Sequence, residues 1–103
     1  VIAVNCSHNP DVAKKYARLA AKLGFVSHNA SEEDKLGSLL KAIIKLQRTL
    51  KCPITLTDFG VDKATSEIKL NLMTDRALED MCYRFNPYPA NHDDIIGLYK
   101  NVL

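Results

Sequence analysis

Residues 9–24 read NPDVAKKYARLAAKLG, and this stretch decides the fold class because it carries the signals of an amphipathic helix. Pro10 stands in the first turn, where its missing N–H leaves no helical hydrogen bond unmade. Gly24 follows as a stop signal. Apolar side chains recur between them at helical spacing: Val12, Tyr16, Leu19, Ala20 and Leu23. We therefore predict an amphipathic helix over this stretch.

A second, longer helix is predicted from Ser31 to about Lys51. Ser31 is a good N-cap, and Asp34 three residues later makes a variant of the capping box. Pro53 ends the pattern because proline cannot continue a helix. The residues at helical spacing are Leu36, Leu39, Leu40, Ile43, Ile44, Gln47 and Leu50.

The next segment offers only one short helical turn, with Thr55 as its cap, Asp58 in the first turn and Gly60 as its C-terminal glycine. Residues 66–82 then contain good helix formers. They form either one helix or two, with a break near Thr74. The side chains expected to point inward are Ile68, Leu72, Leu78 and Met81.

The final helix is predicted to start after Asn91. Asn91 caps it, Asp94 stands three residues on, and two aspartates lie near the positive end of the helix dipole. Residues 86–91, which contain Asn86-Pro87, are interpreted as a rigid turn that positions this helix, because proline fixes its own backbone torsion and pushes the preceding residue into an extended form. The residues expected to face inward are Ile95, Leu98, Tyr99 and Val102.

These patterns predict an all-α fold, a multi-helical bundle-like domain of about five to six helices that covers residues 1–103. A chain of 103 residues has the size of one ordinary domain, and no strand pattern, repeat or linker interrupts it. The chain lacks an initiator Met and begins in the middle of a pattern, so we expect it to be part of a longer protein.

The composition argues against several classes of partner. A formal net charge of +2 is far from the basic excess of nucleic-acid-binding surfaces. No apolar run approaches the roughly 20 residues that cross a bilayer, so we expect no membrane partner. The cysteines form no C-x-x-C pair and are odd in number, which favours a reducing, cytoplasmic location: Cys6, Cys52 and Cys82.

The chemistry-bearing residues do not form a complete catalytic set. His8, His28 and His92 lack the spacing of a helix-borne metal pair, and surface histidines are the favoured interpretation. Thiol catalysis by Cys82 would need a pair with His92 and an orienting group; a buried structural cysteine is the commoner alternative. Two rows of basic residues are interpreted as solvated outer helix faces, with an anion-binding surface as the alternative: Lys14, Arg18, Lys22 and Lys41, Lys45, Arg48.

Five pieces of the sequence, in order along the whole chain, resemble the C-terminal helical part of iron-containing (iron-activated) alcohol dehydrogenases. The first two are the V-x-x-x-N helix end at residues 1–5, which in that family follows the last metal histidine, and K-Y-A-R-L-A-x-x-L-G at residues 15–24. The third, a proline-started L-x-x-[FL]-G-V turn, is matched by Pro53, Leu56 and Phe59-Gly60-Val61. The last two, A-x-x-D-x-C-x-x-x-N-P and D-I-x-x-L-Y, are matched by Ala77, Asp80, Cys82, Asn86-Pro87, Asp94-Ile95 and Leu98-Tyr99.

The resemblance implies the helical domain of an enzyme that uses Fe²⁺ (or Zn²⁺) and NAD(P) to interconvert a small alcohol and an aldehyde. The metal ligands and the dinucleotide-binding loop would lie in an N-terminal domain of the same polypeptide, so this segment alone is expected to be inactive and to bind neither group; a homo-oligomer is compatible with this interpretation. Cys82, Tyr83 and Phe85 would border the substrate cleft. Two departures, Tyr83 where the family often has Thr and Tyr88 where it often has Arg, bear on substrate preference. The alternative function is a stand-alone, non-catalytic helical interaction module.

Overall fold

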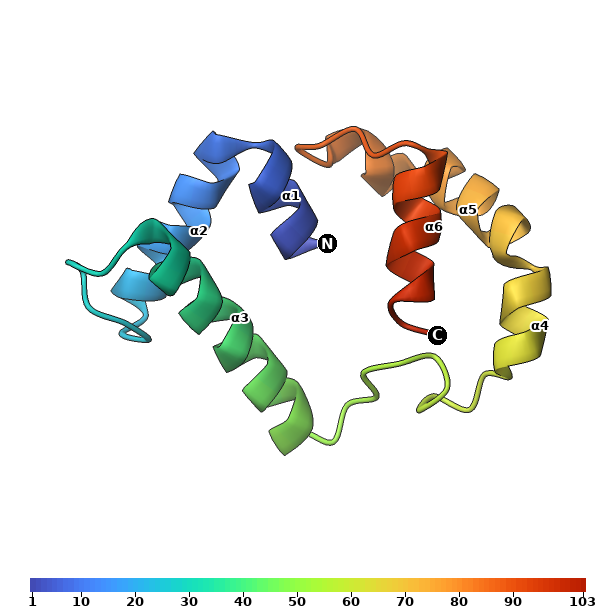
Figure 1. Cartoon of the computed structure of the whole chain (residues 1–103), viewed down its shortest axis with the longest axis horizontal. Helices are drawn as coiled ribbons and strands as arrows, with labels where there is room; N and C mark the ends of the chain where they lie inside the picture. Colours follow the sequence, from blue (N-terminus) through green and yellow to red (C-terminus); the bar gives the residue numbers. More distant parts are fainter. The chain divides into compact units, whose positions relative to one another are not determined.

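The computed structural model describes residues 1–103 and contains six α-helices, one 3₁₀ helix and no strand (Figure 1). The all-α prediction of five to six helices is therefore confirmed. No helix is both long and apolar enough to span a membrane. The chain divides into two compact units, Val1–Cys52 and Pro53–Leu103. The elements are α1 Ile2–His8, α2 Pro10–Lys22, α3 Glu32–Thr49, α4 Lys63–Ile68, α5 Leu70–Glu79, η1 Met81–Phe85 and α6 His92–Lys100.

In the first unit, α2 begins and ends where the sequence signals predict. The Asn9 side chain accepts hydrogen bonds from the backbone N–H groups of Asp11 (3.1 Å) and Val12 (3.3 Å), and Pro10 occupies the first turn. After the helix, Gly24 has a φ of +76°, a left-handed conformation that glycine adopts without strain. The predicted amphipathic helix is confirmed.

The long helix α3 is also confirmed, with its cap as predicted. Ser31 Oγ accepts the Asp34 N–H at 3.0 Å and donates to Asp34 Oδ2 at 2.7 Å. The helix ends at Thr49, slightly before the predicted Lys51, because Lys51 takes a left-handed φ of 54°.

Small side chains form the core of this unit. α2 packs against both α1 and α3, whereas α1 and α3 do not pack against each other. The buried apolar residues are Ala13, Ala17, Ala20, Ala21 and Leu39. Because four of these five are alanines on α2, the neighbouring helices approach its backbone closely.

The second unit opens with the predicted single turn. The Phe59 N–H donates to Thr55 O at 3.3 Å, the Asp58 N–H donates to Thr55 Oγ1 at 3.0 Å, and Gly60 has a φ of +86°. The Leu56 N–H donates to Val102 O at 2.7 Å, which joins this turn to the C-terminal end of the chain. Thr55 as the cap of this turn and Gly60 as its C-terminal glycine are confirmed.

The expected break near Thr74 is wrong. The chain leaves helical geometry at Lys69, between α4 and α5, and Thr74 lies fully buried inside α5, which packs against α6. Three of the residues expected to point inward are exposed: Ile68 (85%), Leu72 (55%) and Met81 (71%). The break at Lys69 interrupts the single apolar face that a continuous helix would present; only Leu78 of the expected set is half-buried.

The last helix, α6, has the cap that the sequence predicts. The Asp94 N–H donates to Asn91 Oδ1 at 3.0 Å, and the Asn91 N–H donates to Asp94 Oδ2 at 2.8 Å, which completes a capping box. The residues expected to face inward are all half-buried: Ile95, Leu98, Tyr99 and Val102.

Candidate functional site

The residues predicted to border a substrate cleft lie together on the short helix η1. Asp80 starts this helix by accepting the Cys82 N–H on its side-chain Oδ1 at 2.7 Å and the Tyr83 N–H on its backbone carbonyl at 3.1 Å. Cys82 and Phe85 are exposed, the latter at 81%, whereas Tyr83 is half-buried. The local fold therefore presents the Cys82 thiol and the Phe85 ring to the surroundings, beside the exposed side chains of Met81 and Arg84.

Tyr83 anchors η1 to the turn that follows it. Its hydroxyl donates to the carbonyl oxygen of Ala90 at 2.6 Å, and the Asn86 N–H donates back to Tyr83 O at 3.0 Å. Ala90 is itself buried. This hydrogen bond spans seven residues, so it fixes the position of η1 relative to the start of α6.

Tyr88 makes a second anchor, on the cap of α6. Its hydroxyl donates to Asp94 Oδ2 at 2.8 Å, the same oxygen that accepts the Asn91 N–H. This hydrogen bond, more than desolvation, raises the pKa of Tyr88 above its ordinary value. From the sequence, Tyr83 was predicted to border the cleft and to depart from the family pattern, and Tyr88 only to depart from it; no short-range spacing signal points to the partners that their hydroxyls find. The interpretation of residues 86–91 as a rigid turn before a capped helix is confirmed.

His92, the base that thiol catalysis by Cys82 would need, contacts Asp75 instead. The cysteine is free and exposed, so it is not a buried structural cysteine. His92 Nε2 lies 3.4 Å from Asp75 Oδ1, which ties α6 to α5, and no hydrogen bond joins His92 to Cys82. A thiol without a neighbouring base or cation is a poor nucleophile at neutral pH. The exposed side chains of this helix can shape a surface.

The side chains of this chain do not assemble a metal site. No group of three or more His, Cys, Asp and Glu side chains lies close enough together to hold an ion. His8 ends α1, with Nδ1 2.9 Å from Val4 O, and His28 is exposed in the loop between α2 and α3. These donors therefore do not fit the metal that the resemblance implies.

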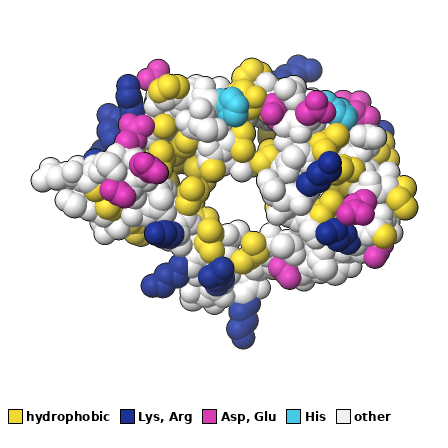
Figure 2. Space-filling view, in the orientation of Figure 1, with side chains coloured by type: hydrophobic (Ala, Val, Ile, Leu, Met, Phe, Trp, Pro, Cys, Tyr) yellow, Lys and Arg dark blue, Asp and Glu magenta, His cyan; other side chains and the backbone are white.

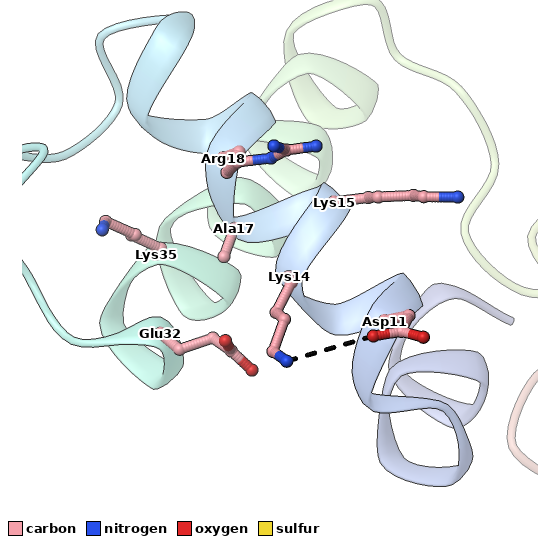
Figure 3. A pocket seen from close by; sticks show the side chains of 7 residues that line it. All are labelled: Asp11, Lys14, Lys15, Ala17, Arg18, Glu32 and Lys35. Atoms are coloured by element: carbon pink, nitrogen blue, oxygen red, sulfur yellow. Dashed lines mark ion pairs between the residues drawn. The ribbon is translucent and has the colours of Figure 1, made fainter.

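The basic residues of α2 border a shallow depression of about 490 Å³ (Figure 3). Its cationic side chains do not converge: Lys15 and Lys35 extend in opposite directions, and Lys14 Nζ lies 3.9 Å from Asp11 Oδ1. Figure 2 shows Lys and Arg beside Asp and Glu at the upper left, and a group of Lys and Arg without acidic side chains among them at the lower left. Both predicted rows are exposed, which favours the solvated outer faces over an anion-binding surface.

Comparison with known proteins identifies the family. The model described as Fe-containing alcohol dehydrogenase family, C-terminal, matches residues 1–103. The NADPH-dependent butanol dehydrogenase of Clostridium saccharobutylicum is 25% identical over 89 residues, which are 86% of this chain and 22% of that protein.

Two further relatives give the same result. The 1-propanol dehydrogenase of Salmonella typhimurium is 30% identical over 94 residues, 91% of this chain and 25% of that protein. The lactaldehyde reductase of Escherichia coli is 30% identical over 96 residues, 92% of this chain and 24% of that protein. The chain thus spans about a quarter of the length of these curated relatives. It belongs to the Fe-containing alcohol dehydrogenase family and corresponds to the C-terminal part of its members.

Proposed function

We propose that this chain is the helical, substrate-side domain of an alcohol dehydrogenase that depends on a metal ion and NAD(P) and transfers hydride between a small alcohol or aldehyde and the nicotinamide. The family match along residues 1–103 carries this proposal. The activities for which the relatives are named, on butanol, 1-propanol and lactaldehyde, support a short alcohol or aldehyde as the substrate class.

The proposal divides the work between two parts of one polypeptide. An N-terminal domain would hold the dinucleotide and the Fe²⁺ or Zn²⁺, because the side chains of this chain form no metal site and its four glycines are isolated from one another. A bound metal ion of this kind polarises a substrate oxygen. The residues of this chain hold no metal in this proposal, because their donor atoms do not fit one.

The contribution of this chain is to shape the substrate pocket. Cys82 and Phe85 are exposed side chains without fixed charge, suited to contact the carbon chain of an alcohol. Tyr83 acts as a positioning residue through its hydrogen bond to Ala90 O. Because η1 is anchored at this tyrosine, the exposed side chains of Cys82 and Phe85 keep fixed positions, which a size-selective pocket wall requires.

The test uses the whole polypeptide that the gene encodes. It should reduce NAD⁺ or NADP⁺ in the presence of 1-propanol or 1-butanol, lose this activity on dialysis against a chelator, and regain it with Fe²⁺ or Zn²⁺. Residues 1–103 expressed alone should show no such activity with the same additions, because they lack a metal site. No alcohol-dependent reduction after metal reloading would contradict the proposal and leave the helical interaction module as the remaining candidate.

A further inference from the structure

An open apolar groove of about 580 Å³ lies in the first unit, between α1 and α3. It exists because both helices pack on α2 and not on each other, so Ala13 of α2 forms its floor. One wall comes from α1 and the other from α3; Figure 1 draws these two helices in blue and green. The side chains of the α1 wall are Ile2, Ala3, Cys6 and Ser7, and those of the α3 wall are Glu32, Glu33, Leu36, Gly37 and Leu40.

Both walls present residues at helical spacing. Ile2 and Cys6 are four residues apart on α1, and Leu36 and Leu40 are four residues apart on α3, so each pair lies on one helix face. A Cβ added at Gly37 would meet no atom within 4 Å. The groove therefore has two apolar walls and unfilled space above the α3 backbone.

We propose that this groove is the docking site for an apolar segment of the same polypeptide, contributed by the sequence that precedes Val1 in the longer enzyme. This inference rests on the proposed function, since it requires the chain to be the C-terminal part of a longer protein. The relatives match this chain over only 22–25% of their length, and the matching family model is the C-terminal one. Polypeptide that enters at Val1 arrives beside Ile2, on the groove wall itself.

This occupant suits the groove better than the alternatives. A segment tethered at Val1 has a high effective concentration at the groove and needs no separate association. A small ligand is usually buried over most of its surface, which an open groove does not provide. A second copy of the chain would have to bring its own apolar ridge into each groove, at the entropic cost of association.

Cys6 reports whether the groove is covered. Its side chain is half-buried on the α1 wall, and burial, followed by the charge of Glu32, raises the pKa of its thiol. Its alkylation in the native polypeptide should be at least about tenfold slower than in the same polypeptide unfolded in urea, because access then requires the segment to open. Peptide mass spectrometry would follow Cys6 separately from Cys52 and Cys82.

The decisive variant is Gly37→Leu, because an occupied groove and an empty groove predict opposite changes in the Cys6 alkylation rate and in Tm. If the segment occupies the groove, the added side chain displaces it, so Cys6 alkylation speeds up and Tm falls. If the groove is empty, the leucine covers Cys6 and improves helix propensity, so alkylation slows and Tm rises. Gly97→Leu is the matched control, since Gly97 is also helical with no atom within 4 Å of an added Cβ, and it should leave Cys6 alkylation unchanged. Gly37→Ala repeats the comparison with a smaller change should the leucine variant not fold.

Slower alkylation with a higher Tm in Gly37→Leu would overturn the proposal, and so would Cys6 protection that falls when the protein is diluted, since that indicates a second copy. If either result is found in an enzyme that is active on alcohols, the docking proposal is rejected and the proposed function is retained. If Gly37→Leu shows faster Cys6 alkylation and a lower Tm in a polypeptide without alcohol-dependent activity, the docking site is retained and the proposed function is rejected.

Discussion

Each of the two units of the chain is stabilised internally by a different kind of interaction. In Val1–Cys52, the buried residues are mainly alanines of α2 against which α1 and α3 pack. In Pro53–Leu103, the buried residues are Ser66, Thr74 and Ala90, and hydrogen bonds between distant residues connect the elements, such as Tyr83 to Ala90 and Thr57 to Leu103. The first unit should therefore be sensitive to side-chain volume, and the second to the loss of single polar atoms.

The largest effect is expected from Ala20→Leu in the first unit. Ala20 is 0% exposed in the contact region of α2, so a larger side chain must push the helices apart. The free energy of unfolding should fall by about 1–3 kcal/mol, measured by urea denaturation with circular dichroism. Amide exchange followed by mass spectrometry should show faster exchange in α2 and α3.

The control is Ala64→Leu, at an exposed position of α4, which should change stability by less than about 0.5 kcal/mol. Equal losses in the two variants would show that tight packing of α2 is not what holds the first unit.

A smaller effect is expected from Asn91→Ala in the second unit. The change removes the side-chain oxygen that accepts the Asp94 N–H, so the first turn of α6 loses half of its capping box. We expect a loss of about 1 kcal/mol of stability. Amide exchange should accelerate in α6 and leave α2 unchanged. Asn29→Ala, at an exposed loop position, provides the control; acceleration in both units would contradict the separation between them.

The smallest effect is expected in the stability at acidic pH when Asp62, which caps α4, is replaced by Asn. The Asp62 carboxylate accepts hydrogen bonds from Thr65, including its backbone N–H at 2.7 Å, and these bonds lower its pKa below the ordinary 3.8. A lowered pKa in the folded state means that the stabilisation is present above pH 3.8 and is lost as pH falls through the folded-state value. Asp62→Asn keeps a capping oxygen but cannot titrate. Between pH 5 and about pH 3, the wild type should therefore lose more stability than the variant, and identical losses would contradict the assignment.

The two units also differ in how much of them the sequence predicts. The helices α2, α3 and α6 follow from local signals: Pro10 and Gly24 for α2, caps at Ser31 and Asn91 for α3 and α6, and apolar side chains at helical spacing. Local signals suffice there because a cap needs a partner only two or three residues away. The exposure of Ile68 and Met81 was missed: the chain leaves helical geometry at Lys69, directly after Ile68, and again at Asp80, directly before Met81, and these breaks were not predicted.

The candidate site was predicted only in part. The position of Cys82 beside a turn and a capped helix could be inferred, but the anchoring roles of Tyr83 and Tyr88 could not, since a tyrosine hydroxyl can reach partners at many sequence distances. The groove between α1 and α3 was missed for a related reason. It results from the way two helices pack on a third, which periodicity within one helix does not specify.

The central claim, that η1 borders the substrate, is tested most directly by comparing Cys82→Ala with Cys52→Ala in the intact enzyme. Both cysteines are free and exposed, so the two variants make the same chemical change in different units. Cys82→Ala should alter the ratio of kcat/KM for a long and a short alcohol, by about 1–3 kcal/mol for each methylene-sized change in fit. Cys52→Ala should leave this ratio unchanged. An unchanged ratio in Cys82→Ala would contradict the wall role, and complete loss of turnover in a stably folded Cys82→Ala enzyme would contradict the conclusion that this thiol is not a catalytic group.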